Sequence, residues 1–509
     1  MWSWNAALLF TAGVFAKTVV NTLTLTDAII APDGFNRSAI VVNGITPGTV
    51  ITANKGDTIQ VKVQNQLTDE SMNRSTSVHW HGIRQYHNNA MDGAAFVTQC
   101  PIAPGQSFTY QFSTGNQAGT FWYHSHFRRQ LCEGLRGPLI IYDPNDPYKS
   151  MYDVDNASTI ITISDWYHIN AFQIATNLPD SLLVNGLGRY SGGPPSPLAV
   201  INVVQGKRYR FRLLNIACVT DYVFSIDNHV LTIIEADGEP TQPLVVDSIV
   251  IGTAQRYSFV LEANQPVDNY WIRGNLSEAT TSFDNGLNSA ILRYSGAPVA
   301  DPPTRNWTLV NELQEYNLHG VNTTVPGVPG VGDADVNLNL VAQFNATAVQ
   351  WNINNVSYTS PETPILLQIL SGALTTAQLV PQGSIYTLPP NKSIEVSFPG
   401  ALLASSHSFH LHGHAFDVVR SAGSTQYNYV NPVRRDTVRS GTPTDNVTIR
   451  FATDNAGPWF LHCHIDVHLD LGMAVVFAED PADTAASDPV TSQWKQLCNI
   501  YDALPPSEQ

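Results

Sequence analysis

Short runs in which apolar and polar residues alternate recur along nearly the whole chain. The runs are rich in Val, Ile, Thr, Tyr and Phe and are bounded by Gly, Pro, Asn or Asp; examples are TIQVKVQNQL, SFTYQFS, GTFWYHSH, LIIYDP, RYRFRLLNI, HVLTIIEAD and RYSFVLEAN. A period of two residues places successive side chains on opposite faces of a β-strand. Helical periodicity is weak, and 34 Gly and 32 Pro would interrupt long helices. The pattern predicts an all-β protein of sandwiches or barrels.

Two segments interrupt the strand pattern and are interpreted as domain boundaries. They are DPNDPYKS (143–150) and the Pro-rich GAPVADPPTRN (296–306). Domains usually contain about 100–200 residues, so 509 residues favour three. We therefore predict β domains at 17–147, 148–302 and 303–509, and a loop inside the third domain at 325–337.

The first 16 residues, MWSWNAALLFTAGVFA, are apolar, uncharged and end in small residues. This pattern is typical of a secretory signal peptide, and the run is too short to span a bilayer. Ten N-x-S/T sequons are consistent with passage through a glycosylating route. We expect a secreted glycoprotein that begins at Lys17 and has no membrane anchor.

The chain is acidic, with a formal net charge of −16 and a pI of about 5.3. It contains no run rich in Lys or Arg, so phosphate backbones and anionic lipids would be repelled. Neither nucleic acid nor a membrane is expected as a partner.

Most of the 15 histidines occur in pairs separated by one residue. In a strand such a pair points to one side, and a single pair would be unremarkable on a surface or in a core. Eight imidazoles from four distant segments are different, because each buried imidazole needs a polar partner. Metal binding is the simplest hypothesis for His79 and His81, His124 and His126, His410 and His412, and His462 and His464.

The chain has five cysteines, so two disulfides in an oxidising compartment leave one thiol. Cys463 lies between His462 and His464, and in a strand its sulfur would point away from both imidazoles. The tripeptide could therefore serve two metal sites joined through the backbone. A thiolate with two imidazoles and a weak thioether suits copper, and His407, His468 and Met473 are available to complete such a site. Zinc would be satisfied by one closed tetrahedral set of ligands and would not use the further imidazoles, so zinc is disfavoured.

Four motifs carry a resemblance to a known family. HWHG (79–82), HSH (124–126), HSFHLHGH (407–414) and HCHIDVH (462–468) resemble the copper-binding motifs of the multicopper oxidases, and the chain is most similar to the fungal laccases. The resemblance spans nearly the whole chain beyond residue 16. It implies three cupredoxin-like Greek-key domains and four coppers, one of type 1, one of type 2 and two of type 3.

The resemblance also implies a role for each ligand. His407, Cys463 and His468 would bind the type 1 copper, with Met473 as a candidate axial ligand. His79 and His410 would bind the type 2 copper. The type 3 pair would be bound by His81, His124, His126, His412, His462 and His464.

Two acids and the remaining cysteines fit the same picture. Asp92, in NNAMDG, matches an acid that delivers protons in laccases, although it could also be a turn residue before Gly93. Asp466 could orient the imidazole of His464 or cap a turn. The resemblance implies disulfides Cys100–Cys498 and Cys132–Cys218, whereas the sequence alone leaves all three pairings open.

Several positions depart from the laccase pattern. Val219 stands where many fungal laccases have an acidic or amide residue that hydrogen-bonds a phenol, and Asp221 two residues later could replace it. Met473 stands where many fungal laccases have Leu or Phe. If its thioether binds the type 1 copper, it would lower the reduction potential of that copper. The alternative is that Met473 is a core residue. Ser408 replaces the Pro that usually follows the first type 1 histidine, and Val467 replaces a Trp before His468. Arg128 and Arg129 follow the HSH motif, where small polar residues are common.

The expected activity is oxidation of phenols or aromatic amines by a secreted monomer, with dioxygen reduced to water. The substrate would dock at the edge of His468, electrons would pass through Cys463 to His462 and His464, and Asp92 would supply protons. A ferroxidase is the alternative and would need acids flanking the type 1 histidines. A catalytically silent copper-binding protein is a further alternative, which we would expect to have lost ligands.

Overall fold

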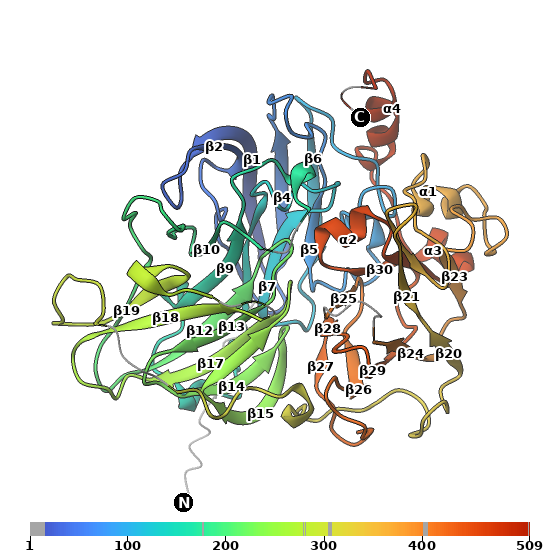
Figure 1. Cartoon of the computed structure of the whole chain (residues 1–509). Coiled ribbons are helices and arrows are strands. Elements are labelled where there is room, and N and C mark those ends of the chain that lie inside the picture. Colours follow the sequence, from blue (N-terminus) through green and yellow to red (C-terminus); the bar gives the residue numbers. More distant parts are fainter. Residues whose placement is uncertain are drawn as a thin grey trace, which may run out of the picture.

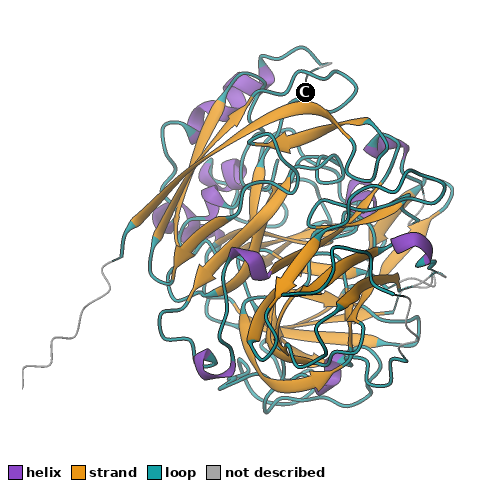
Figure 2. Cartoon of the chain, turned by 90° about the vertical axis from the view of Figure 1, so that its left-hand side faces the viewer, coloured by secondary structure: helices purple, strands orange, loops and turns teal. Residues whose placement is uncertain are grey.

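The computed structural model describes residues 16–175, 178–277, 279, 281–303, 308–400, 406–506 and 508. The predicted signal peptide lies outside the described residues apart from Ala16. β-Strands dominate the fold, with short helices at the periphery (Figures 1 and 2). All seven runs identified in the sequence form strands, so the prediction of an all-β protein is confirmed.

The strands of the N-terminal third form two four-stranded sheets. Their strand orders are β2–β1–β4–β6 and β3–β8–β7–β5. In β4 and β6 alternate residues are buried, whereas β7 is buried along its whole length because other parts of the molecule cover it. The strands are β1 (Thr18–Ile30), β2 (Arg37–Val42), β3 (Ile51–Asn54), β4 (Thr58–Asn65), β5 (Val78–His81), β6 (Ser107–Ser113), β7 (Gly119–Ser125) and β8 (Arg136–Tyr142).

The middle third forms a six-stranded and a five-stranded sheet. Their orders are β10–β9–β12–β17–β14–β15 and β11–β19–β18–β13–β16. The strands are β9 (Ile160–Trp166), β10 (Ser181–Val184), β11 (Val200–Val203), β12 (Arg208–Asn215), β13 (Tyr222–Ile226), β14 (Leu231–Ala236), β15 (Glu239–Val246), β16 (Ser248–Ile251), β17 (Arg256–Glu262), β18 (Asn269–Leu276) and β19 (Ser289–Tyr294).

The C-terminal third forms two five-stranded sheets and a hairpin. The orders are β20–β24–β29–β26–β27 and β23–β31–β30–β25–β28, and β21 pairs with β22. The strands are β20 (Val336–Asn339), β21 (Ala342–Asn345), β22 (Gln350–Ile353), β23 (Ile385–Leu388), β24 (Ser393–Pro399), β25 (Ser408–Leu411), β26 (Phe416–Arg420), β27 (Arg434–Arg435), β28 (Thr437–Arg439), β29 (Asn446–Ala452), β30 (Gly457–Cys463) and β31 (Ala474–Glu479).

Within the described residues no sheet mixes strands from two of these thirds. On this basis we propose to keep the predicted domain limits, 17–147, 148–302 and 303–509. The α-helices of the described residues all lie in the last third: α1 (Ile365–Leu370), α2 (Asp466–Asp470), α3 (Pro481–Ser487) and α4 (Leu497–Asp502). None of the described helices is both long enough and apolar enough to cross a bilayer.

The C-terminal segment returns to the first domain. Trp494, Leu497 and Tyr501 are buried in the same apolar cluster as the core of the N-terminal sheets. The Cys100–Cys498 disulfide fixes this contact covalently, and Cys132–Cys218 joins the first domain to the second. The predicted disulfide pairing is therefore confirmed.

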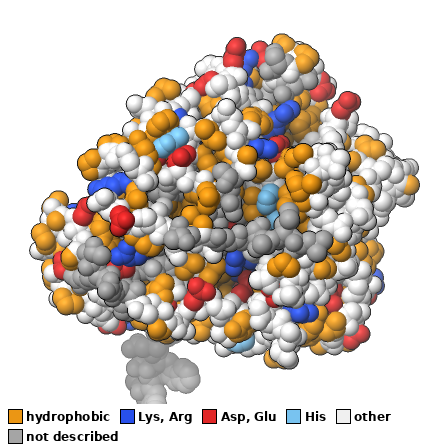
Figure 3. All heavy atoms as spheres, viewed as in Figure 1, with side chains coloured by type: hydrophobic (Ala, Val, Ile, Leu, Met, Phe, Trp, Pro, Cys, Tyr) orange, Lys and Arg blue, Asp and Glu red, His pale blue; other side chains and the backbone are white. Residues whose placement is uncertain are grey.

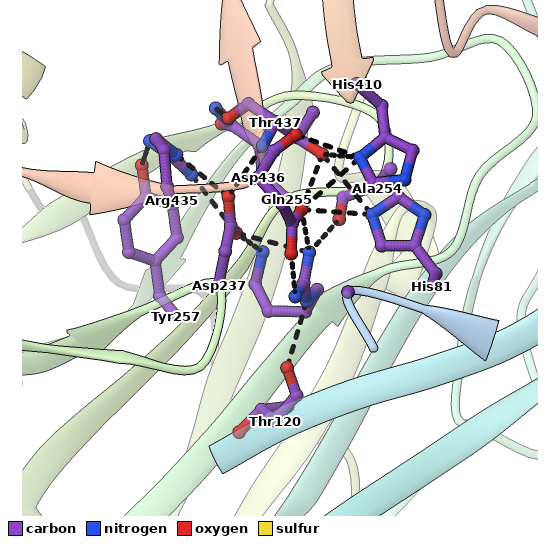
Figure 4. A network of polar contacts seen from close by, with 12 residues as sticks. His81, Thr120, Asp237, Ala254, Gln255, Tyr257, His410, Arg435, Asp436 and Thr437 are labelled. Carbon is purple, nitrogen blue, oxygen red and sulfur yellow. Dashed lines mark hydrogen bonds and ion pairs between the residues drawn. The ribbon is translucent and has the colours of Figure 1, made fainter. Parts of the chain in front are cut away.

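A buried network of charges joins all three domains (Figure 4). Arg256 of β17 is fully buried and binds Asp436 of the third domain through both ends of its guanidinium, at 2.7 and 2.6 Å. Its Nε donates to the carbonyl of Thr120 in β7, 2.9 Å away. Asp237 accepts a hydrogen bond from the backbone of Arg256 and pairs with Arg435. Buried charges are tolerated only when each has such a partner.

Replacing Arg256 by Gln would leave the Asp436 carboxylate buried without its cation. We expect the free energy of unfolding to fall by about 3–5 kcal/mol, measured by denaturant unfolding of the copper-free protein. Arg208→Gln is the matched control, because Arg208 pairs with Asp153 at the exposed surface and its loss should leave the unfolding curve unchanged. Equal effects of the two variants would contradict the importance of the buried network.

Candidate metal centre

Two pairs of neighbouring strands, together with the residues directly next to their ends, carry most of the predicted ligands. β5 and β7 are antiparallel and place His79 opposite His124. β25 and β30 are also antiparallel and place His410 opposite His462. The two strand pairs come from the first and third domains and meet near the middle of the molecule (Figure 1). Segments more than 300 residues apart in the chain therefore contribute to one centre.

The free thiol lies in a compact group with two imidazoles. The Sγ of Cys463 is 3.7 Å from the Nδ1 of His407 and 3.7 Å from the Nδ1 of His468. The two Nδ1 atoms are 3.1 Å apart. His407 and Cys463 are fully buried, whereas His468, on α2, is half-buried. The group can thus bind a metal in the interior and reach solvent through one imidazole edge.

A second set of imidazoles lies on the other side of Cys463. The Nε2 atoms of His79 and His410 are 3.4 Å apart. The Nε2 of His462 is 3.1 Å from that of His412 and 3.3 Å from that of His126. Cys463 therefore points to one group while its neighbour His462 belongs to another, as the alternation of side chains in a strand predicts.

The remaining predicted ligands are His81, His124 and His464. Their ring centroids lie 5.0 Å apart for His81 and His464, 5.0 Å for His124 and His464, and 5.7 Å for His81 and His124. The Nδ1 of His81, the Nε2 of His124 and both ring nitrogens of His464 are buried without a hydrogen-bond partner among the described residues. Buried polar nitrogens are normally paired, so these atoms are available to a metal.

Fixed oxygen atoms hold the opposite nitrogen of six of these imidazoles; for His124 this is the carbonyl of Ser125, 2.7 Å from its Nδ1. The Nδ1 of His79 donates to the carbonyl of Asp92 at 2.8 Å, and that of His412 to the Asp92 carboxylate at 2.8 Å. The Nδ1 of His410 donates to the carbonyl of Asp436 at 2.9 Å, and the Nε2 of His81 to its carboxylate at 3.1 Å. The carbonyl of Cys463 accepts from His462 Nδ1 at 3.0 Å. Such contacts fix the ring orientation and the tautomer of a metal ligand.

Burial keeps the imidazoles neutral. Desolvation is the main cause that lowers the pKa of His407 to about 4, and it lowers the pKa of His412, His462 and His464 well below the usual value. Burial also raises the pKa of the Cys463 thiol. Neutral imidazoles are the form that binds metals, and a bound cation favours loss of the thiol proton.

The donor set fits copper. Nitrogen lone pairs that face each other at 3.1–3.4 Å repel in the absence of a cation, because the opposite nitrogens already donate hydrogen bonds. One thiolate with two imidazoles suits a blue copper site, and the other imidazoles suit further coppers. Asp436, which also lies near His81 and His410, is engaged by Arg256 and acts as a hydrogen-bond acceptor.

Met473 lies three residues after α2, directly before β31, and is buried in the core. Its backbone connects two predicted ligands, since its carbonyl accepts from the Cys463 amide and its amide donates to the His468 carbonyl, each at 3.0 Å. Whether its thioether is an axial ligand stays a prediction. Asp466 begins α2 and does not orient His464, whose ring nitrogens have no described partner. The alternative, that Asp466 caps a turn, is not supported either, because the N-cap of α2 is Ile465 and no side chain makes a capping hydrogen bond there.

Two of the side chains considered in the departures from the laccase pattern, Asp221 and Arg129, make other contacts. The Asp221 carboxylate accepts from the backbone amide of Thr253 at 2.8 Å and from Arg439 Nε at 2.9 Å. It is thus engaged by two donors, and whether it replaces the residue missing at Val219 stays a prediction. Arg129 pairs with Asp470 at 2.8 Å, which leaves Arg128 as the exposed cation of the two.

Sequence reasoning missed two groups of residues at the centre. Asp436 and Arg256 orient His81 and His410 from outside the motifs, and the only signal was a charged run in an otherwise apolar strand region, Arg434–Asp436. Trp351 of β22 packs against the rings of His407 and His468, with centroids 4.8 and 4.9 Å away. No motif surrounds Trp351, so its position could be found only from the fold.

Comparison with known proteins supports the same conclusion. Family models described as multicopper oxidase match residues 24–146, 157–297 and 358–483. The chain is 56% identical to a laccase from Pycnoporus cinnabarinus over 495 residues and 57% identical to laccase-2 from Trametes versicolor over 498 residues. Each alignment covers 96% of this chain and 95% of the relative.

Two solved structures show the same architecture. The laccase from Botrytis aclada superposes with a TM-score of 0.85 at 32% identity, covering 96% of this chain and 93% of that one. Fet3p, a multicopper oxidase that functions in iron import, superposes with a TM-score of 0.82 at 28% identity, covering 96% of both chains.

These likenesses confirm the predicted fold of three cupredoxin-like β domains and the predicted cofactor, four coppers of types 1, 2 and 3. Since the family models match all three domains and the identity to curated laccases exceeds half, the chain belongs to the multicopper oxidase family.

Proposed function

We propose that this chain is a laccase-like oxidase that takes single electrons from phenols or aromatic amines. Four electrons and four protons then convert one dioxygen to two waters. The observation that carries the proposal is the position of Cys463, whose sulfur belongs to one group of ligands while both adjacent histidines belong to the other. Copper, when bound, supplies the redox chemistry, and the protein supplies geometry, potential and proton access.

We assign the ligands as the sequence predicts. His407, Cys463 and His468 would hold the type 1 copper, with Met473 as a candidate axial ligand. The type 2 copper would be held by His79 and His410. The type 3 pair would be held by His126, His412 and His462 on one side and by His81, His124 and His464 on the other. The contacts between Nε2 atoms support the first of these two triads, and the unpartnered buried nitrogens support the second.

Electrons would enter at the half-buried edge of His468. His407 and Cys463 are fully buried, so His468 is the type 1 ligand that a small aromatic molecule can touch. Trp351 covers one side of both imidazoles and limits the approach of water. From Cys463 a covalent path of one peptide unit leads to His462 and another to His464.

Dioxygen needs access from another side. A cavity of 450 Å³ is lined by His126 together with Arg128, Tyr358, Phe460 and Asp470. His126 is 9% exposed, so its ring forms part of the cavity wall. The cavity is large enough for dioxygen and water to pass between solvent and this edge of the centre.

Asp92 is placed to transfer protons beside the centre. Its carboxylate is 1% exposed and touches two ligand imidazoles: Oδ2 accepts from the Nδ1 of His412 at 2.8 Å, and Oδ1 lies 3.3 Å from the Nδ1 of His79. A carboxylate beside two ligand imidazoles can accept a proton and pass it toward the site of dioxygen reduction.

Oxidation of ferrous ion is the second candidate, because the structure of Fet3p is similar over the whole chain. A cationic substrate would favour free carboxylates near the type 1 ligands. Asp221 and Asp470 are instead paired with Arg439 and Arg129. This pairing favours an uncharged organic reductant.

We further propose that the protein is secreted and acts as a monomer without nucleic acid or membrane partners. The uncharged apolar N-terminal run and the sequons support secretion. On the face shown in Figure 3, the described Lys and Arg side chains are scattered and form no continuous patch, as expected if polyanions are not partners.

Oxygen uptake by the copper-loaded protein distinguishes the candidate substrates. We expect kcat/KM for a methoxyphenol to exceed that for ferrous ion, and Cys463→Ser to abolish turnover of both. His87→Gln, at an exposed histidine outside the centre, is the control and should retain full activity. Faster turnover of ferrous ion would overturn the substrate class, and uptake that survives in Cys463→Ser would overturn the mechanism.

Asp92→Asn should slow the reduction of dioxygen and leave the oxidation of the substrate unchanged. We expect kcat to fall by about 10²-fold or more, the usual contribution of a proton-transfer group. Rapid mixing without oxygen should still bleach the blue colour at the wild-type rate, whereas recovery of the colour after oxygen is admitted should slow. Slower bleaching would place Asp92 in a different role.

Met473→Leu tests the axial thioether. If the sulfur binds the type 1 copper it stabilises the cupric state, so its removal should raise the reduction potential. A redox titration of the blue band measures this shift. Met72→Leu, at a buried methionine of the first domain, should leave the potential unchanged, and an unchanged potential in Met473→Leu would make Met473 a core residue.

A further inference from the structure

A buried carboxyl group from the C-terminal segment contacts the loop that carries Asp92. Asp488 directly follows α3 and is 1% exposed. Its Oδ1 accepts a hydrogen bond of 2.6 Å from the backbone amide of Asn89. Its Oδ2 is buried without a hydrogen-bond partner among the residues that the structure describes. The contact joins the third domain to the first.

Asn89 is held firmly at this point. It begins the 3₁₀ turn Asn89–Met91, and its Nδ2 donates to the carbonyl of Pro458 in β30 at 2.9 Å. Gly457 adopts a φ of +135°, and a Cβ there would lie 2.8 Å from the Asn89 side chain. The side chain therefore packs against a backbone with no free space.

The other end of the same turn is Asp92. Its amide donates to the carbonyl of Asn89 at 3.0 Å, while its own carbonyl and carboxylate hold His79 and His412. The next residue, Gly93, is pressed against β5, because a Cβ there would lie 1.8 Å from the carbonyl of Val78. With no slack at either end, a displacement of Asn89 must be transmitted to Asp92.

The surroundings of Asp488 are uncharged. α3 packs against α1 and β30, and β30 packs against the 3₁₀ turn. Residues 88–91, 365–370 and 457–461 contain no ionisable side chain, and Asp483, the only ionisable residue of α3, is exposed. Burial, opposed only by the hydrogen bond from Asn89, raises the pKa of Asp488 to about 7.

We propose that Asp488 is a positioning residue, whose neutral carboxyl group holds Asn89 and through it fixes Asp92 against His79 and His412. Loss of the proton puts an unpaired charge in this apolar site, which opens the contact to water and loosens the turn. The inference rests on the proposed role of Asp92 for its effect on activity, but not for its effect on structure.

The direction of the pH effect follows from linkage. The ordinary pKa of an Asp is about 3.9 in the unfolded chain, and the folded value lies above it. Asp488 therefore contributes stability that is fully present below about pH 4 and is lost as the pH rises through about 7.

Asp488→Asn and Asp488→Ala separate the two parts of the proposal. The Asn variant keeps the hydrogen-bond acceptor and is neutral at every pH. Its Tm should therefore equal that of the wild type at pH 4 and exceed it at pH 8. The Ala variant has no acceptor, and hydrogen exchange of the amides of residues 89–92 should accelerate at least about tenfold at both pH values. Asp483→Asn, an exposed position on the helix that precedes Asp488, should change neither quantity.

The spectrum of the type 2 copper is a further readout, because it depends on the orientation of His79. We expect Asp488→Ala to change this electron paramagnetic resonance signal and to slow reoxidation, with reduction by substrate unaffected. Exchange at residues 89–92 that stays at the wild-type rate in Asp488→Ala, or an Asn variant that follows the wild-type dependence of Tm on pH, would overturn the proposal. A preference for ferrous ion would overturn only the proposed substrate.

Discussion

The structure depends on holding many neutral imidazoles in a dry interior with their lone pairs directed at one another. Contacts of 3.1–3.4 Å between such nitrogens are repulsive until a cation lies between them. The fold must therefore fix the rings from behind, and for six of them it does so with backbone carbonyls and with the carboxylates of Asp92 and Asp436. Because metal ligands are held in this way before a metal arrives, little reorganisation is needed on binding.

The middle domain contributes no predicted ligand and is nevertheless essential to this arrangement. Arg256 neutralises Asp436, and Asp237 anchors both Arg256 and Arg435. Without this domain the carboxylate behind His81 and His410 would be a buried charge with no counterion, which is among the most destabilising arrangements in a protein. The middle domain thus acts on the centre through charge, while the outer domains act through coordination.

The sequence predicts the elements that repeat and misses those that depend on distant partners. Alternation of side chains was sufficient to find the strands and to place the sulfur of Cys463 opposite its neighbouring imidazoles. The contact between Arg256 and Asp436 joins residues 180 positions apart, and no local pattern encodes it. Helix α2, which carries His468, is only five residues long and gives no detectable periodicity. The engagement of Asp221 by Arg439 is likewise visible only once the domains are packed together.

The division of ligands between the two ends of the chain constrains biosynthesis. His79 and His410 are 331 residues apart, which at about 5–20 residues per second corresponds to roughly tens of seconds of ribosome time. No prefix of the polypeptide that stops before residue 468 contains all the ligands assigned here, and Cys498 must follow before the tail can be locked. The complete centre can therefore form only after residue 468 has been made, and truncated chains that end before it cannot assemble all of its ligands.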